Sequence, residues 1–404
     1  MRALFFVTAV VAVSLAAAGR KTNCPDYCFC TDDSVMCTNN ELTAIPHELP
    51  PDTMHLDLSH NLISEIKSDQ FAQLRKLRTI RISNNKLFHV RPHAFRGLPD
   101  LREIELRDNP LKALPAMSFS DLADVRVIDL SSNKIDVIAR DTFAGSSDVG
   151  QLNLNFNPLT GIESFAFANL TGVGKLSIAT ANEVALRPDT FNGLRDVHSL
   201  IFVSNMTDVP AYALRGLRDV RVLQMACASN ASISSLAFSG AENIKNIQLK
   251  GVAYIERFAF YGVVNVGKLY LDDVATLDFA SLVGLAGELD RLDMGQSRFN
   301  CNCYWQWINK YDSTQLSREH LQKIVCNAPP KYDGLSVTDV KFEEMDCPPA
   351  ATPSLPDSDD SELHMHTPTS DGVDAAKAEP ESGTSMLCAC AVVTALSALL
   401  GLLI

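Results

Sequence analysis

Apolar residues recur along the chain in pairs separated by one residue, and these pairs return at almost constant intervals. The first pair is Leu56 and Leu58, and ten more begin at residues 80, 104, 128, 152, 176, 200, 223, 247, 269 and 292. The first six intervals are 24 residues long, and the last four are 22 to 24 residues long. A period of this length over eleven copies indicates a solenoid, in which each repeat buries its apolar face against its neighbours.

Each pair predicts a short strand whose two apolar side chains point into the core, while the residue between them points outward. Two more columns share the period: Asn61, Asn85, Asn109, Asn133, Asn157 and Asn205 at one position, and Phe71, Phe95, Phe119, Phe143, Phe167, Phe191 and Phe238 at another. The amide of each asparagine can pair with backbone groups of a turn, and the phenylalanines fill the core on the convex side. Because later repeats lack the asparagine, we expect less regular turns beyond about residue 217.

The pattern Leu56-x-Leu58-x-x-Asn61-x-Ile63 resembles the leucine-rich repeat, and cysteine clusters before and after the repeats resemble the caps of extracellular members of that family. The resemblance implies an α/β leucine-rich repeat solenoid, a horseshoe with a parallel concave sheet of about eleven short strands. It also implies an N-terminal cysteine-rich cap over residues 24–52, repeats over residues 53–298 and a C-terminal cysteine-rich cap over residues 299–347.

Eight of the eleven cysteines flank the repeats, four on each side. Such sets could bind zinc, but in a secreted chain they more often form disulfides, and the spacing alone allows three pairings in each cap. The family pattern pairs first with third and second with fourth, which implies the disulfides Cys24–Cys30, Cys28–Cys37, Cys301–Cys326 and Cys303–Cys347. Of the other three cysteines, Cys388 and Cys390 lie in the C-terminal apolar segment. Cys227 is left over, either as a buried free thiol or as half of an intermolecular disulfide.

Both ends of the chain carry apolar segments. Residues 1–18 predict a secretory signal peptide, and residues 386–404 contain no charge. Between the repeats and this tail, residues 348–385 are polar and acidic, which predicts a disordered stalk. No basic residue follows the tail, so we favour a glycosylphosphatidylinositol (GPI) signal over a transmembrane helix. The expected attachment residue is Asp374, with Ser382 as the alternative.

Charge and motifs narrow the function further. The formal net charge is −13, so nucleic acid is not an expected partner. The chain lacks the nucleophile elbow and the H-E-x-x-H zinc motif, and its nearest approach to a phosphate loop has Asn169 where glycine is needed. We therefore expect no enzyme activity, cofactor or metal. Sequons at Asn169 and Asn230 predict N-glycosylation, whereas Asn205 stands in the asparagine column and is not expected to be modified.

The predicted ligand site lies on the concave sheet. Ile201, Val203 and Val222 are apolar at outward positions where polar residues are expected, and Gln224 and Tyr270 stand in the central outward column. Neighbouring exposed apolar side chains are candidates for a binding core. The alternative interpretation is that a glycan, an irregular turn or a shifted strand covers them.

The combination of two caps, repeats and a lipid-anchor signal is similar to that of the Nogo receptor and the insect adhesion protein connectin. This resemblance implies a non-catalytic recognition, adhesion or co-receptor protein on the outer leaflet of the plasma membrane. Its expected partners are an extracellular protein ligand and a transmembrane co-receptor. The alternatives are a single-pass membrane protein or a secreted protein that organises the extracellular matrix.

Overall fold

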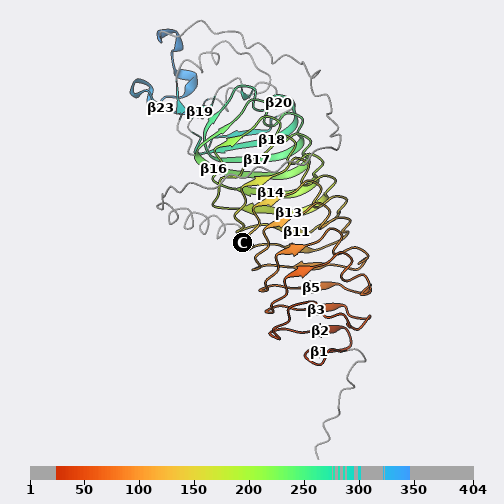
Figure 1. Cartoon of the computed structure of the whole chain (residues 1–404). Coiled ribbons are helices and arrows are strands. Elements are labelled where there is room, and N and C mark those ends of the chain that lie inside the picture. Colours follow the sequence, from red (N-terminus) through yellow and green to blue (C-terminus); the bar gives the residue numbers. More distant parts are fainter. Residues whose placement is uncertain are drawn as a thin grey trace, which may run out of the picture.

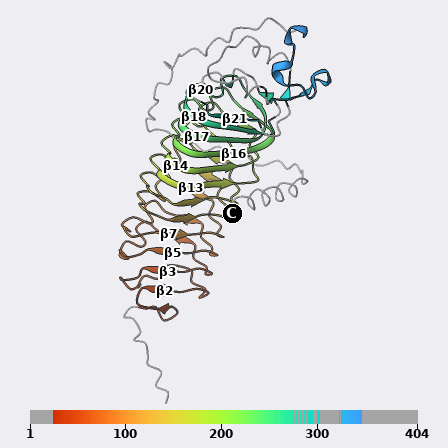
Figure 2. The same cartoon turned by 180° about the vertical axis from the view of Figure 1, so that it is seen from behind.

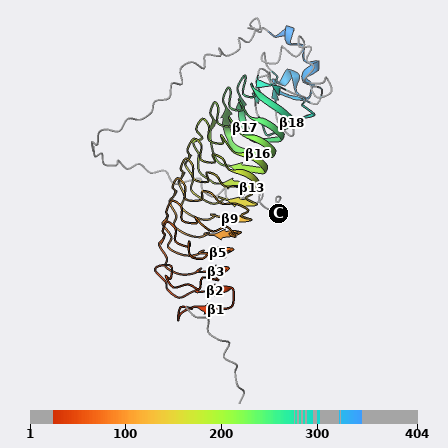
Figure 3. The same cartoon turned by 90° about the vertical axis from the view of Figure 1, so that its right-hand side faces the viewer.

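The chain forms an elongated, curved solenoid in which strands stack side by side from one cap towards the other (Figure 1). This computed structural model describes residues 24–274 without a break, and then residues 276–277, 281–282, 285–286, 289–294, 299–301, 322 and 324–345. The predicted signal peptide, stalk, tail and Asp374 lie outside these residues. Viewed from the side, the strands line one face of the arc and the turns line the other (Figure 3).

Eleven parallel strands form the concave face, one for each apolar pair. They are β3 (His55–Asp57), β5 (Thr79–Arg81), β7 (Glu103–Glu105), β9 (Val127–Asp129), β11 (Gln151–Asn153), β13 (Thr171–Ala179), β14 (Arg195–Val203), β16 (Arg218–Ile233), β17 (Glu242–Ile255), β18 (Val263–Asp272) and β21 (Arg291–Asp293). With β1 (Phe29–Cys30), β2 (Ser34–Met36), β15 (Asp208–Val209), β19 (Thr276–Leu277) and β20 (Leu285–Ala286) they make a sheet of 16 strands. The predicted parallel horseshoe is confirmed.

The strands are not uniformly short as predicted. Those from β3 to β11 have three residues, whereas β13, β14, β16, β17 and β18 have 9 to 16 residues. The long strands of the later repeats continue where the earlier repeats turn. The irregularity expected beyond residue 217 appears as a shift in the register of β16 and β17 between Ala226 and Ala231.

The five asparagines from Asn61 to Asn157 form a buried ladder under the turns, each 2 to 5% exposed. Asn109 shows the pattern. Its Nδ2 donates to the carbonyls of Ile82 and Leu106 at 2.8 and 3.0 Å, and its Oδ1 accepts from the Leu87 amide at 3.0 Å. The side chain therefore satisfies backbone groups of two neighbouring repeats, which lets the chain leave a short strand at a sharp angle.

The convex side of the core is filled by stacked aromatic rings. Successive rings from Phe71 to Phe191 have centroids 5.4 to 6.1 Å apart, and Leu214 follows Phe191 before the stack resumes with Phe238 and Phe260. The connections on this side are turns and the short strands β4 (Glu65–Ile66), β6 (His89–Val90), β8 (Ala113–Leu114), β10 (Val137–Ile138) and β12 (Gly161–Ile162). Residues 24–274 contain no helix.

Disulfides close both ends of the apolar core. Cys24–Cys30 and Cys28–Cys37 hold the N-terminal cap, where β1 and β2 pair antiparallel and β2 extends the concave sheet. Cys301–Cys326 joins the end of β22 (Phe299–Asn300) to β23 (Cys326–Ala328). These are pairs that the family resemblance implies, and each contributes about 2–4 kcal/mol.

The described residues after β23 form the 3-10 turns η3 (Pro330–Tyr332), η4 (Val337–Asp339) and η5 (Phe342–Glu344). The expected fourth bridge, Cys303–Cys347, lies outside the described residues. No helix within the described part of the chain is long and apolar enough to cross a bilayer.

Candidate functional site

One unbroken column of outward side chains runs along the middle of the concave face. Its members are Asp57, Arg81, Glu105, Asp129, Asn153, Ser177, Ile201, Gln224, Gln248, Tyr270 and Asp293, and each pairs in register with the next. The strands that carry it face the viewer in Figure 2. Because strands in a sheet are spaced by about 4.8 Å, the column presents side chains at regular intervals on a rigid frame.

Four of the predicted ligand residues come together on β14 and β16. Ile201 pairs with Gln224, and Val222 lies one outward position before Gln224 on the same strand. Val203, Val222 and Gln224 are half-buried, but Ile201 is only 7% exposed. The apolar surface offered to a ligand is therefore Val203 and Val222 rather than Ile201.

Tyr270, the fifth predicted residue, lies two strands away from Gln224, with Gln248 between them. It is half-buried, and the guanidinium of Arg291 lies 5.8 Å from the centre of its ring. This contact holds the ring at the C-terminal part of the column, separate from the apolar residues.

The first repeats present paired charges on the concave face. Arg81 binds the carboxylates of Glu103 and Glu105 at 2.6 and 3.2 Å, and Arg126 approaches Glu103 at 3.3 Å. Burial raises the pKa of Glu105, and its hydrogen bond with Glu103 raises it further. Although burial opposes it, hydrogen bonds from Glu105 and Arg81 hold the pKa of Glu103 below its ordinary value. These side chains largely neutralise one another.

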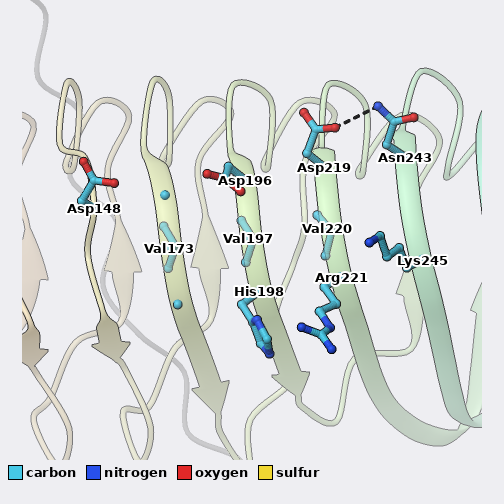
Figure 4. A pocket seen from close by; sticks show the side chains of 12 residues that line it. Asp148, Val173, Asp196, Val197, His198, Asp219, Val220, Arg221, Asn243 and Lys245 are labelled. Carbon is cyan, nitrogen blue, oxygen red and sulfur yellow. Dashed lines mark hydrogen bonds between the residues drawn. The ribbon is translucent and has the colours of Figure 1, made fainter.

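A hollow of about 520 Å³ lies at the edge where β13, β14, β16 and β17 begin (Figure 4). Its lining forms three rows: Asp148, Asp196, Asp219 and Asn243 near the strand starts, the buried Val173, Val197 and Val220, and then His198, Arg221 and Lys245. The valines form the floor between an acidic row and a basic row. The sequence analysis did not identify these residues, although their 23- or 24-residue spacing would have revealed them.

Backbone conformation explains the acidic row. Asp148, Asp196, Asp219 and Asn243 have φ angles of 54 to 57°, in the left-handed region that Asp and Asn tolerate better than other side-chain-bearing residues. Within the row, the Nδ2 of Asn243 donates to the Oδ1 of Asp219 at 2.8 Å. These residues therefore have a structural reason to be Asp or Asn at the turn.

The predicted glycosylation sites differ in accessibility. Asn169 and Asn230 are exposed, whereas the Nδ2 of the half-buried Asn205 donates to the Ala181 carbonyl at 2.6 Å. Cys227 is a free thiol, and burial raises its pKa to about 12, so it is protonated at neutral pH. Among the residues that the structure describes, no three His, Cys, Asp or Glu side chains gather into a metal site.

Two family models match the chain. Leucine rich repeat matches residues 37–87, 51–111 and 99–159, and BspA type Leucine rich repeat region (6 copies) matches residues 184–278. Human leucine-rich repeat-containing protein 3B is 37% identical over 78 residues, which are 19% of this chain and 30% of that protein. Pig biglycan is 42% identical over 77 residues, 19% of this chain and 28% of that protein. The chain thus spans less than a third of each relative.

The crystal structure of human 5T4 (Wnt-activated inhibitory factor 1, Trophoblast glycoprotein) is 20% identical, with a TM-score of 0.35. The likeness covers 81% of this chain and 99% of that chain.

Proposed function

The chain belongs to the leucine-rich repeat family, and we propose that it is a non-catalytic recognition protein of the cell surface. It binds an extracellular protein on its concave face. The observation that carries this proposal is the column of eleven outward residues in continuous register. Such a surface recognises a partner without rearranging, because its side chains stand on a rigid sheet rather than on loops.

The contact with the ligand centres on Val203 and Val222. Both are half-buried and lie on opposite sides of the paired Ile201 and Gln224, and Gln224 is a polar side chain that can fix the orientation of a partner. The charges of the first repeats contribute less, because Arg81, Glu103 and Glu105 already pair with one another. A small apolar centre within a polar surround is the usual anatomy of a protein interface.

To test this site, cells that display the full chain are probed with a library of purified extracellular domains. The change Val203→Asp with Val222→Asp should abolish capture of the ligand that the unchanged chain selects. The matched control is Leu62→Asp with Phe88→Asp, which adds the same charge at exposed apolar residues of the turns. Undiminished capture by a normally secreted V203D/V222D variant would remove this surface from consideration.

A lipid anchor is the second part of the proposal. The uncharged tail at residues 386–404, the polar spacer before it and the small residues after Asp374 support a GPI signal. An outer-leaflet anchor does not reach the cytoplasm, so signalling would require a transmembrane co-receptor.

A phosphatidylinositol-specific lipase should release the protein, tagged after Arg20, from the cell surface. Surface signal that persists after the lipase would favour a transmembrane helix. Protein in the medium without lipase would favour the secreted, matrix-organising alternative.

A further inference from the structure

Basic residues occupy the same register position in six of the eleven repeats along one margin of the concave sheet, and Met54, Gly150, Gly174, Gly267 and Asp290 occupy it in the others. Arg78, Arg102 and Arg126 occupy it in the earlier repeats, and His198, Arg221 and Lys245 occupy it in the later ones. The stacking is direct, since the Arg102 amide donates to the Arg78 carbonyl at 2.8 Å and the Arg126 amide to the Arg102 carbonyl at 2.7 Å. Adjacent members of the row are therefore spaced by about 5 Å.

The later half of this row is free to meet a ligand. His198, Arg221 and Lys245 are exposed, and none of them pairs with a side chain of the described residues. The acidic row beside them lies beyond the buried valines, at the other end of the hollow (Figure 4). Lys175 and Lys268 stand one position further along β13 and β18, which widens the positive strip against the overall charge of −13.

Between the two halves of the row, the side chains are replaced by hydrogen at Gly150 and Gly174. A Cβ on Gly150 would lie 2.6 Å from the Arg126 carbonyl oxygen, and a Cβ on Gly174 would collide with the Gly150 carbonyl oxygen. The close approach of the strands thus requires glycine at both positions. It leaves bare backbone at the end of the hollow, where a bulky ring can lie against the sheet.

We propose that this margin binds a sulfated polysaccharide, lying along the solenoid axis with its anionic groups on Arg221, Lys245 and His198. A row of basic side chains on neighbouring strands complements a linear chain whose sulfate and carboxylate groups also recur at short intervals. Disulfides place the chain in an oxidising compartment, where sulfated polysaccharides rather than nucleic acids are the abundant linear polyanions. The inference goes beyond the protein-binding function, because it uses another class of ligand and the adjoining row of side chains, in which Arg221 directly precedes Val222.

Heparin is the probe, and the full chain at about 150 mM salt is the sample. The change Arg221→Gln with Lys245→Gln should weaken heparin binding about 10-fold, because two charge contacts are lost. The slope of the logarithm of affinity against the logarithm of salt concentration should fall by about 1–2, since each contact releases counterions from a linear polyanion. The matched control is Lys86→Gln with Lys134→Gln, two exposed lysines of the turns, which should leave both quantities unchanged.

Three outcomes would overturn the proposal. They are failure of the unchanged chain to bind heparin, an equal loss in the control, and equal binding of phosphatidylserine vesicles or a DNA duplex with the same sensitivity to R221Q/K245Q. The last result would describe a generic anion surface. Heparin binding should persist in V203D, because Val203 pairs with Ala226 and lies away from Arg221, so the outcome is distinguishable from failure of the protein-binding site. Thermal unfolding of R221Q/K245Q checks that the fold is retained.

Discussion

The repeats over residues 37–159 and those over residues 184–278 share one apolar core. They differ at the corner of the repeat, where the chain leaves the concave strand. In the first region, three-residue strands end at a turn whose backbone groups are bound by a buried asparagine. In the second region, β16 and β17 continue through the corner and satisfy those groups strand to strand. A solenoid therefore needs its buried backbone groups paired, but neighbouring repeats can use different partners.

Removing one ladder amide should have the largest effect. Asn109→Ala leaves the buried backbone amides of Leu87 and Asn85 without their acceptor. It also removes one of the two side-chain hydrogen bonds that the carbonyls of Ile82 and Leu106 accept. We expect the free energy of unfolding to fall by roughly 3–5 kcal/mol, since each unpaired buried group costs about 1–3 kcal/mol. Asn205→Ala, which removes one half-buried hydrogen bond, should cost less than about 1 kcal/mol. Urea unfolding measures both, and equal losses would mean that the ladder is not special.

The converse change tests the second region. Val252 stands at the ladder position of a repeat without asparagine and is fully buried. Val252→Asn should destabilise by roughly 2–4 kcal/mol, because the strand pairs its backbone and leaves the new amide without partners. A neutral or stabilising V252N in the same urea experiment would show that the corner can revert to a ladder.

Ion pairs between consecutive repeats also distinguish the two regions, through the pH dependence of stability. Arg215 donates to both carboxylate oxygens of Asp189, whose side chain is 12% exposed, and this holds the pKa of Asp189 below its ordinary value. The folded state therefore gains stability above about pH 4, and that gain is lost as pH falls through the lowered pKa.

Asp189→Asn should cost about 1–3 kcal/mol at neutral pH and much less at the acid end. The corresponding pair of the first region, Asp69 with Arg96, is 40 and 59% exposed, so solvent screens it and Asp69→Asn should have a smaller effect than Asp189→Asn. Thermal melts of D189N, D69N and the unchanged chain across pH 3–7 measure how much stability each ion pair contributes. A D189N loss that is constant over this range would contradict the assignment.

The smallest expected effect concerns the aromatic stack. Phe143 lies between Phe119 and Phe167, with ring centroids 5.8 and 5.7 Å away, whereas the second region has Leu214 in the equivalent place. Phe143→Leu should reduce the free energy of unfolding by about 1–2 kcal/mol, through lost ring contacts and a small void. If urea unfolding of F143L shows no loss, leucine serves as well in both regions.

The repeat period and the alternation of inward and outward residues predict most of the strand arrangement but less of the surface that the strands present. The spacing of Leu56 and its equivalents places all eleven strands in register, because one inward face repeats in every copy. It does not predict how far each strand runs. The lengths of β16 and β17 depend on partners in the next repeat rather than on local residues.

The candidate site illustrates the same limit. The outward direction of Ile201 is predicted by alternation, but its 7% exposure depends on how neighbouring side chains crowd a concave surface. The cations Arg221 and Lys245 were missed because they lie outside the strict alternation of the triplet, at the margin of longer strands. Their shared register was visible in the sequence, whereas the hollow beside them required the stacked backbone.

Stacking each repeat only on its neighbours also has a mechanical consequence. Pulled at its two ends, such a body should yield one repeat at a time, because the strand contacts of the described residues join neighbouring repeats. Each repeat of 24 residues would release about 80 Å of chain. Disulfides keep the loops that they close from extending; these are Cys24–Cys30, Cys28–Cys37 and Cys301–Cys326. On a cell surface under shear, the array would act as an extensible tether with two inextensible ends.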